Sequence, residues 1–377
     1  MQATLTSSYQ ERLGTIIADV VGPQAEAVDR EAVFPGQGVA ALAESGLLGL
    51  ISAREVGGLG FGLAEAADMI EQLAQYCGST AMVACMHFAA VAVIEAHGTL
   101  AVREDVARGR ALATLAFSES GSRSHFWQPL GTATPGVDGV RLDGAKSWVT
   151  SAAKADLYIW SSRPLAGEGA SSLWLVPAAT SGLRVIGAFD GLGLRGNCSS
   201  PITAEAAIVA PDAMLGPDGG GFDIMMSTVL PFFQVMNAAV ALGTMEAATR
   251  KAAGHVSATR FEHLGQALAD LPTIRAYIAR MRIKTDLARS LLLDTIDAAR
   301  SGREDAMLKV LEVKAAAGEL STEVTDLGMR VCGGAAFRKE VGVERHFRDS
   351  RAATAMAPTT DVLYEFIGRA ACGLPLF

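Results

Sequence analysis

The sequence has few residues from which a covalent or metal-based framework could be built. Its 377 residues include five cysteines, Cys77, Cys85, Cys198, Cys332 and Cys372, and no two of them have C-x-x-C spacing. An odd and scattered set of cysteines indicates neither a disulfide framework nor a zinc site. We therefore expect free thiols, no bound metal, and a reducing, cytoplasmic setting.

A basic surface and a targeting segment are also missing. The net charge is −8, and the 32 Lys and Arg residues are dispersed among 40 Asp and Glu. This pattern favours neither nucleic acid nor an anionic membrane as a partner. Residues 1–5 do not begin a charged segment followed by an apolar core, and no uninterrupted apolar run reaches the ~20 residues that span a bilayer. Half of the residues are hydrophobic, which is typical of a well-packed globular protein with room for more than one core.

Apolar periodicity divides the chain into three segments. Residues 1–112 and 213–377 show helical spacing, and the second of these is long enough for a four-helix bundle. Residues 113–212 alternate as β-strands do. The expected strands are 113–117, 139–142, 147–150, 157–160, 172–176 and 206–209. We therefore expect an α+β protein with a helical N-domain, a central β-barrel or sandwich, and a C-terminal four-helix bundle.

The stretch from Leu115 to Ser151 carries the strongest chemical signal. Its first strand leads into a loop rich in Ser and Gly, which lets backbone N–H groups approach a planar polar ligand. Trp148 then offers an aromatic wall, with the hydroxyl of Thr150 beside it. From these residues alone, the edge of a β-sandwich with a polar loop is an equally good interpretation.

The order of the motifs resembles the acyl-CoA dehydrogenase family of flavoproteins. Ser118-Glu119-Ser120 stands where the family has Thr-Glu-Pro, and residues 143–151 match its Asn/Asp-Gly-x-Lys-x-Trp/Phe-Ile-Thr-Asn pattern. Residues 46–60 are similar to the family's Leu-Leu-Gly and Gly-Gly signature. Residues 343–351 match its Val-Glu-Arg-x-x-Arg-Asp-Ala-Arg block, whose charges we expect to form a structural network. The resemblance covers nearly the whole chain and implies the family's three-domain fold.

The resemblance also implies a non-covalent FAD between the β-domain and the bundle. Phe117 and Ser118 would meet the pyrimidine edge of the flavin, and Trp148 and Thr150 would flank the ring and N5. A neighbouring subunit would hold the dinucleotide half, so a homodimer or homotetramer is expected. The implied contacts to that half are Arg260, Arg330, Gly333 and Gly334, and Thr359 and Asp361 are further candidates for cofactor binding. For Arg330, a solvated side chain before a helix-ending glycine pair remains an alternative.

The catalytic base of the family is missing. In most members a Glu stands at the sixth position after the Arg-Asp-x-Arg block, and here that position is Ala357. Other members carry the base on the first helix of the C-terminal domain, and residues 230–235 contain no carboxylate. Gln234 lies near the place of an Arg that serves the thioester-bound substrate, and Ser124 is a second candidate for substrate binding.

Three functions therefore stay open. The first is α,β-dehydrogenation of an acyl-CoA in fatty acid metabolism, with electrons passing to an electron-transfer flavoprotein. His125, Glu119 or Asp361 would then replace the missing base. The second is a flavin-dependent monooxygenase of the same superfamily, in which His125 and Ser124 lie near the ring. The third is a partner subunit that binds flavin or acyl-CoA without turnover.

Overall fold

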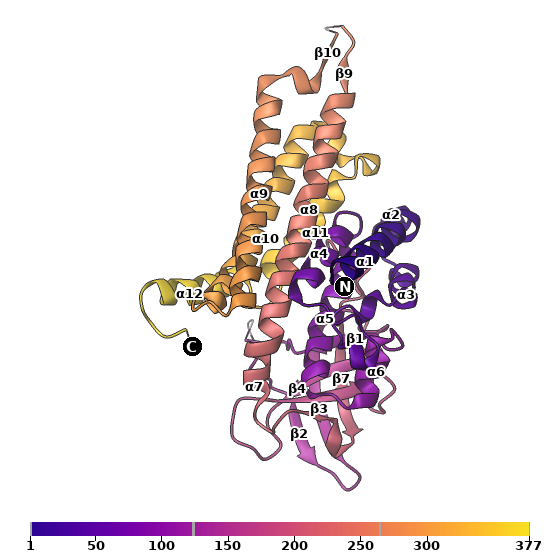
Figure 1. The fold of residues 1–377 in the computed structure, drawn as a ribbon, viewed down its shortest axis with the longest axis vertical. Helices are drawn as coiled ribbons and strands as arrows, with labels where there is room; N and C mark the ends of the chain where they lie inside the picture. The colour runs from indigo at the N-terminus through magenta and orange to yellow at the C-terminus, as the bar shows by residue number, and fades with distance from the viewer. Residues whose placement is uncertain (1, 123–124, 264, 377) are drawn as a thin grey trace. The chain divides into compact units, whose positions relative to one another are not determined.

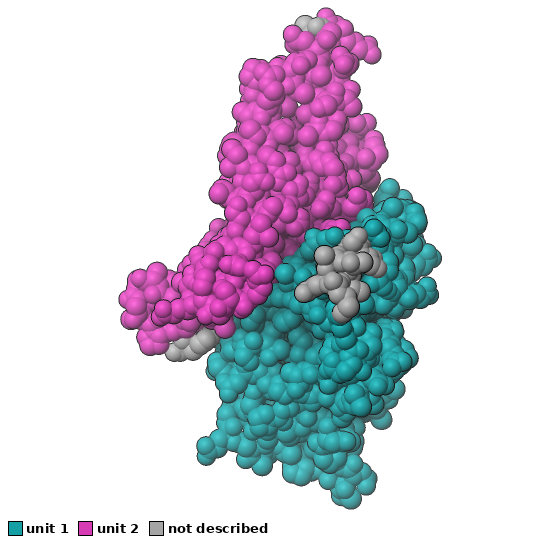
Figure 2. All heavy atoms as spheres, viewed as in Figure 1, with its two compact units in different colours: residues 1–69, 82–190, 195–233 teal, residues 70–81, 191–194, 234–377 magenta. Residues whose placement is uncertain are grey.

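The computed structural model describes residues 2–122, 125–263 and 265–376, with side chains from Tyr9 onward (Figure 1). Backbone contacts group the chain into two compact units (Figure 2). The first unit comprises Met1–Met69, Met82–Asp190 and Arg195–Phe233, and the second comprises Ile70–Ala81, Gly191–Leu194 and Gln234–Phe377. The first unit contains the N-terminal helices and the two larger sheets, and the second contains the long C-terminal helices. The mixture of helices and sheets is the α+β class expected from the sequence.

The N-terminal segment is helical throughout, as the periodicity predicts. Its elements are α1 (Gln2–Ile16), the π-helical η1 (Ile17–Val21), α2 (Gly22–Arg30), α3 (Gly36–Glu44), the 3-10 turns η2 (Leu47–Gly49) and η3 (Arg54–Val56), α4 (Leu63–Ala74), α5 (Gly78–His97) and α6 (Leu100–Ala107). Close packing requires glycine at two positions between α3 and α4. A Cβ on Gly49 would lie 1.9 Å from the carbonyl oxygen of Ala107, and one on Gly58 would lie 2.2 Å from that of Ser52.

Within the described residues, two helices have the length and composition of membrane spans, although the sequence has no long uninterrupted apolar run. They are α5 and the continuous helix Gly221–Ala258. Of their most apolar 18-residue windows, 83% and 78% are buried inside the protein. Burial of this extent is what the core helix of a globular protein shows, because such a helix is apolar on all sides.

The β-rich segment forms two four-stranded sheets. The first has the order β1-β4-β5-β8 and the second the order β2-β3-β7-β6. The strands are β1 (Ala113–Ala116), β2 (Thr132–Pro135), β3 (Val140–Val149), β4 (Leu157–Ser162), β5 (Ser172–Pro177), β6 (Leu183–Val185), β7 (Ser200–Val209) and β8 (Met214–Leu215). β1 pairs with β4 in parallel, and the other described strand pairs are antiparallel. Side chains from both sheets, including Leu142, Trp160, Trp174 and Ile202, form one buried cluster, so this part is a sandwich.

One strand prediction is wrong in an informative way. The strands expected at 139–142 and 147–150 are the two halves of β3, which continues through Asp143 and Gly144. The register with β7 shifts between Leu142 and Gly144, and again between Lys146 and Val149. These irregularities are β-bulges, which bend a strand without ending it.

The C-terminal segment is helical, as expected. Its elements are the 3-10 turn η4 (Pro211–Ala213), α7 (Gly221–Ile224), the π-helical η5 (Met225–Val229), α8 (Leu230–Ala258), the short strands β9 (Arg260–Phe261) and β10 (Gln266–Ala267), the 3-10 turn η6 (Leu268–Asp270), α9 (Pro272–Ser301), α10 (Ala306–Cys332), the 3-10 turns η7 (Gly333–Phe337) and η8 (Lys339–Val341), α11 (Val343–Ala355) and α12 (Thr360–Ala371). Figure 1 shows α8, α9 and α10 side by side. Helical spacing predicts that one face of α9 carries Ile274, Ile278, Met281, Thr285, Ala288 and Leu292. The last four are buried, and the two isoleucines, nearer the start of the helix, are only half-buried.

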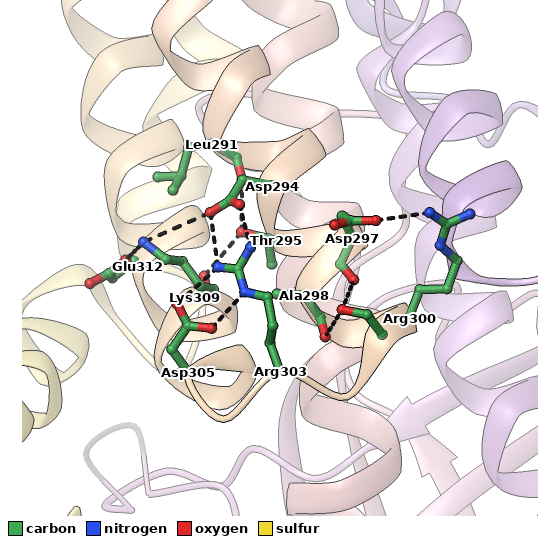
Figure 3. A network of polar contacts seen from close by, with 11 residues as sticks. Leu291, Asp294, Thr295, Asp297, Ala298, Arg300, Arg303, Asp305, Lys309 and Glu312 are labelled. Atoms are coloured by element: carbon green, nitrogen blue, oxygen red, sulfur yellow. Dashed lines mark hydrogen bonds and ion pairs between the residues drawn. The ribbon is translucent and has the colours of Figure 1, made fainter.

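A polar network closes the turn between α9 and α10 (Figure 3). Gly302 ends α9 with a φ of +65°. The guanidinium of Arg303 then lies 2.6 Å from a carboxylate oxygen of Asp294 and 2.8 Å from one of Asp305. All three side chains are partly exposed, so the network stabilises the turn only modestly.

Candidate functional site

Trp148 stands out in the first unit because its large apolar side chain is exposed. Its relative exposure is 71%, and its backbone has a φ of +56°. It lies within the second bulge of β3, where the register with β7 shifts between Lys146 and Val149. Bulges redirect side chains, and a positive φ is unfavourable for a bulky residue. The indole meets Phe189 edge-on at 6.4 Å and otherwise presents an open aromatic face.

The end of β1 lies beside this bulge. The carbonyl oxygen of Ser118 accepts a hydrogen bond of 2.8 Å from the backbone N–H of Ser147. Phe117 is buried and stacks parallel to Phe126, with ring centroids 6.2 Å apart. The structure thus brings Phe117 and Ser118 next to the strand that presents Trp148, although 30 residues separate them in the sequence.

Thr150 is held more tightly than its neighbour Trp148. It is buried, and its hydroxyl oxygen lies 3.1 Å from that of Ser199. Its carbonyl oxygen accepts a hydrogen bond of 2.8 Å from the hydroxyl of Thr114. The sequence did not single out Ser199, because a Ser on a separate segment gives no sign that it meets Thr150.

His125 lies in the loop after β1 and is exposed to solvent. Its Nδ1 lies 3.2 Å from the carbonyl oxygen of Ser122, and its ring meets Trp127 edge-on at 5.1 Å. An exposed ring can reach a ligand, although these two contacts would have to change if it did. Ser124, expected to bind substrate, lies outside the described residues.

The carboxylate of Glu119 is already paired with Lys146 and with a backbone N–H group. Its carboxylate lies 2.5 Å from the side-chain nitrogen of Lys146 and accepts a hydrogen bond of 2.6 Å from the backbone N–H of Leu130. Both charged side chains are almost fully buried. Glu119 could accept a substrate proton only by leaving Lys146 buried without its counter-ion, so we discard it as the base.

In the second unit, Arg260 and Arg330 are both exposed. Arg260 begins β9, and Arg330 lies in the last turn of α10 with its guanidinium 5.1 Å above the ring of Tyr277. That contact does not use the N–H groups of Arg330, which therefore stay available to an anion.

The glycine pair after α10 has open space around it. Gly333 has a φ of +56° and a ψ of −138°, a conformation that only glycine adopts easily. Gly334 has no positive φ, and a Cβ added to either glycine would meet no atom within 4 Å. Because packing within the chain does not require Gly334, room is left for a group from outside to approach the backbone.

Ala357, where the resemblance leads us to expect the catalytic base, lies in the turn between α11 and α12. The side chain of Lys314, on α10, donates hydrogen bonds of 2.7 and 2.6 Å to the carbonyl oxygens of Met356 and Pro358, on either side of Ala357. Lys314 is fully buried, and burial lowers the pKa of its amine to about 7. Sequence reasoning missed this lysine, which holds the turn in place.

Thr359 and Asp361 follow directly. Thr359 is the N-cap residue of α12, and Asp361 is exposed in the first turn of that helix. A carboxylate there interacts favourably with the helix dipole. Burial, then Glu319 and Asp361, raise the pKa of Tyr364 to about 12, so Asp361 lies in an acidic neighbourhood.

Gln234 is fully buried on α8. Neither polar atom of its amide has a hydrogen-bond partner within the described residues. One turn further along the same helix, the amide nitrogen of Asn237 lies 3.6 Å from the sulfur of Met356. This face of α8 therefore lies close to the turn that contains Ala357. Buried polar groups are normally paired, so the amide of Gln234 is suited to a polar ligand group or an ordered water.

The charged block on α11 is structural, as expected. Glu344 accepts a hydrogen bond of 2.7 Å from Arg348, and Arg348 also donates to the carbonyl oxygen of Leu192. Asp349 accepts a hydrogen bond of 2.6 Å from the backbone N–H of Leu194. These contacts anchor the glycine-rich segment Gly191–Leu194 to α11.

A surface cleft of about 450 Å³ lies at α2 and α3 and is lined in part by Val28, Phe34 and Gln37. Of the predicted cofactor and substrate residues that the structure describes, none lines it.

Solved structures share the fold of this chain. Butyryl-CoA dehydrogenase from Megasphaera elsdenii superposes with a TM-score of 0.90, covering 98% of both chains at 22% identity. The FAD complex of PigA superposes with a TM-score of 0.89, covering 98% of this chain and 97% of the other at 21% identity. These likenesses define the fold as that of the acyl-CoA dehydrogenases.

The sequence matches place the chain more closely. Profiles of the N-terminal, middle and C-terminal domains of acyl-CoA dehydrogenase match residues 7–111, 114–207 and 219–372. The mitochondrial short-chain specific acyl-CoA dehydrogenase of Bos taurus is 28% identical over 348 residues, covering 90% of this chain and 83% of that protein. The chain belongs to the acyl-CoA dehydrogenase family.

Proposed function

We propose that this chain is an FAD-dependent oxidoreductase that dehydrogenates an acyl-CoA, or a related acyl thioester, between its α and β carbons. The observation that carries the proposal is the exposed indole of Trp148, on a backbone with a φ of +56°. A bulky residue keeps such a conformation only where the surrounding structure enforces it, and strain of this kind gathers at functional sites. The resemblance to the family also implies a flavin contact at this position.

The residues fit FAD at both ends of the cofactor. Trp148, Thr150 and the Phe117–Ser118 segment would hold the ring, and Arg330 with the backbone at Gly333 and Gly334 would hold the pyrophosphate of a cofactor bound mainly by a second copy. The open space beside the two glycines supports this assignment. When bound, FAD would accept the hydride that leaves the β-carbon.

The α-proton needs an acceptor, and Ala357 cannot serve. His125 and Asp361 are exposed and are the candidates that we retain. Gln234 would meet a polar group of the substrate, because its buried amide has no described hydrogen-bond partner. We further propose a homodimer or homotetramer, and an electron-transfer flavoprotein as the electron acceptor.

The Ala at position 357 also favours a second candidate, a flavin-dependent monooxygenase. Chemistry that uses reduced flavin and oxygen needs no base for an α-proton. A third possibility is a subunit that binds flavin or acyl-CoA without turnover.

Absorbance and anaerobic mixing with acyl-CoAs separate these functions. A yellow protein whose flavin bleaches on addition of an acyl-CoA supports the dehydrogenase. A yellow protein that does not bleach, but inserts oxygen when a reductase supplies electrons from NADH, is the monooxygenase. A protein that takes up no FAD refutes both flavin enzymes and leaves a subunit that binds acyl-CoA alone.

A further inference from the structure

One ion pair in the β-sandwich is almost inaccessible to solvent. The side-chain nitrogen of Lys146, on β3, lies 2.5 Å from a carboxylate oxygen of Glu119. The relative exposures of the two side chains are 0% and 3%. We propose that this pair positions the two chain segments that present the flavin-contacting residues. The inference rests on the proposed flavin site and assigns a role within it to residues that do not touch the cofactor.

Lys146 joins three strands at one point. Besides Glu119, its amine donates hydrogen bonds of 2.7 and 2.8 Å to the carbonyl and hydroxyl oxygens of Ser161, on β4. It also lies 3.5 Å from the carbonyl oxygen of Phe117, next to the end of β1, and 5.0 Å above the ring of Trp160. All the donors of the ammonium group therefore have acceptors.

Glu119 closes the loop that follows β1. Its carboxylate accepts hydrogen bonds from the backbone N–H groups of Leu130, at 2.6 Å, and Gly131, at 3.2 Å. Residues 119 and 131 are the two ends of the loop that carries His125. One carboxylate therefore fixes where the loop leaves the sheet and where it returns.

The pair is adjacent in sequence to both flavin-contacting segments. Glu119 directly follows Phe117 and Ser118, and Lys146 precedes Trp148 by two residues. The bulge that turns the indole outward begins at Lys146, because the register with β7 shifts between Lys146 and Val149. The hydrogen bond from the backbone N–H of Ser147 to the carbonyl oxygen of Ser118 joins the same two segments. Displacement of either charged side chain would therefore move the end of β1 relative to Trp148.

Stability alone does not account for a buried pair of this kind. Taking two charges out of water is costly, and apolar residues of similar volume often replace such pairs without loss of stability. Burial does lower the pKa of the Lys146 amine, to about 8, against the opposing effect of Glu119. Apolar residues would not supply the hydrogen bonds that this pair makes to the two ends of the loop, to the end of β1 and to β4.

Three variants test the role of the pair: Glu119→Gln, Lys146→Met and the double variant with both changes. The double variant leaves no uncompensated buried charge, so it stays informative if a single variant folds poorly. For each protein we would measure the FAD dissociation constant, the melting temperature without FAD, and the rise in melting temperature at saturating FAD. Flavin fluorescence adds a geometric readout, because an indole stacked on the ring quenches it.

We expect the double variant to melt, without FAD, close to the wild type, but to bind FAD about tenfold more weakly, which corresponds to about 1.4 kcal/mol. Its bound flavin should be less quenched, and FAD should raise its melting temperature less than that of the wild type. Glu95→Gln is the matched control. It breaks the 2.9 Å pair with Arg103 in the N-terminal helices, and it should lower the melting temperature equally with and without FAD.

The results distinguish the two ideas. If the wild type binds FAD and the double variant binds it equally tightly and with equal quenching, the positioning role is wrong and the flavin site stands. An equal loss of melting temperature with and without FAD would reduce the pair to a structural element. If the wild type itself takes up no FAD, the proposed function and this inference both fall.

Discussion

The side-chain nitrogen of Lys314 lies 2.6 Å from the carbonyl oxygen of Pro358, the residue that follows Ala357. Lys314 also donates a hydrogen bond to the carbonyl oxygen of Met356. A neutral amine has two N–H donors, and these two carbonyls use both of them. Lys314 therefore holds the turn that contains Ala357 in place.

This contact makes the stability of the protein depend on pH. The pKa of Lys314 is about 7 in the folded chain and 10.5 as its ordinary value. Between these values the unfolded chain binds more protons, so stability rises with pH from about 7 to about 10. Lys314→Met should lack that rise. At pH 10 it should be about 2 kcal/mol less stable than the wild type, because two buried hydrogen bonds are lost.

Urea denaturation at pH 7 and pH 10 provides the measurement. Lys309→Met is the control, because the carboxylates around Lys309 raise its pKa and it contributes no such rise over this range. If the free energies of unfolding of the wild type and of Lys314→Met changed equally between the two pH values, the proposed effect of this contact would be wrong.

Ala357→Glu should introduce dehydrogenase activity or increase it. Proton transfer by a positioned side chain contributes about 10²–10⁴-fold to a rate. We expect anaerobic flavin bleaching by an acyl-CoA to become about 10²-fold faster or more. Ala355→Glu adds the same charge at an exposed position near the end of α11 and should leave the rate unchanged. No gain from Ala357→Glu in a protein that binds FAD would argue for chemistry other than removal of an α-proton.

Two buried histidines should respond in opposite ways to substitution by leucine. His346 is buried, and neither of its ring nitrogens has a described hydrogen-bond partner. Its pKa lies well below 6.5 because of burial and nearby cations, chiefly Arg345 and Lys251. His346→Leu should raise the free energy of unfolding by about 1–2 kcal/mol at pH 7, since two unpaired polar atoms leave the core.

His87 supplies the matched comparison. Its Nδ1 accepts a hydrogen bond from the backbone N–H of Ala113, and its Nε2 lies 3.1 Å from the carbonyl oxygen of Leu48. His87→Leu should therefore destabilise the protein, because two buried backbone groups lose their partner.

The stability of the wild type should also decrease as the pH falls below about 6.5, since the unfolded chain then binds protons that His346 does not bind in the folded chain. His346→Leu should show less of this loss, and an unchanged profile would count against the buried state of His346.

Asp218 should make the β-domain sensitive to acid. Its carboxylate accepts hydrogen bonds from the hydroxyl of Ser172 and from the backbone N–H groups of Leu165, Ala166 and Gly167. Burial alone would raise its pKa, but these bonds outweigh burial and bring it to about 2. The stabilisation is complete above the ordinary value of 3.8 and is lost as the pH falls through about 2.

Asp218→Asn should cost about 1–3 kcal/mol at pH 7, because an amide cannot accept all four bonds. The deficit should disappear near pH 2, in a comparison of guanidinium denaturation at the two pH values. Asp212→Asn, on the exposed turn η4, is the control and should have little effect. A deficit of the same size at both pH values would contradict the assignment.

Local patterns were sufficient for most of the fold. Helical periodicity placed the buried stripe of α9, and alternation placed β1, β4 and β5 to within two residues. The Asp143-Gly144 pair led to the prediction of two separate strands, because such a pair normally marks a turn. In the structure, Asp143 instead accepts a hydrogen bond from the backbone N–H of Ala206 on β7, so the strand continues. That partner is 63 residues away and leaves no local signal.

The site was predictable only in part, for the same reason. The motif around Trp148 was visible in the sequence, but the exposure of its side chain depends on a bulge opposite β7. A lysine in a strand, such as Lys146, gives no sign of burial until Glu119, 27 residues earlier, is known to face it. Lys314 and the turn at Pro358 are 44 residues apart, and only the packing of α10 brings them together.

The left-handed backbone of Trp148 has one further consequence. Glycine relaxes such a conformation, so Trp148→Gly should fold at least as stably as the wild type while losing most of its affinity for FAD. Thermal melting of the cofactor-free protein and FAD titration would show the two effects separately. Selection of this chain for heat resistance alone would therefore favour loss of the indole, and the proposed cofactor site would be lost before any core residue changed.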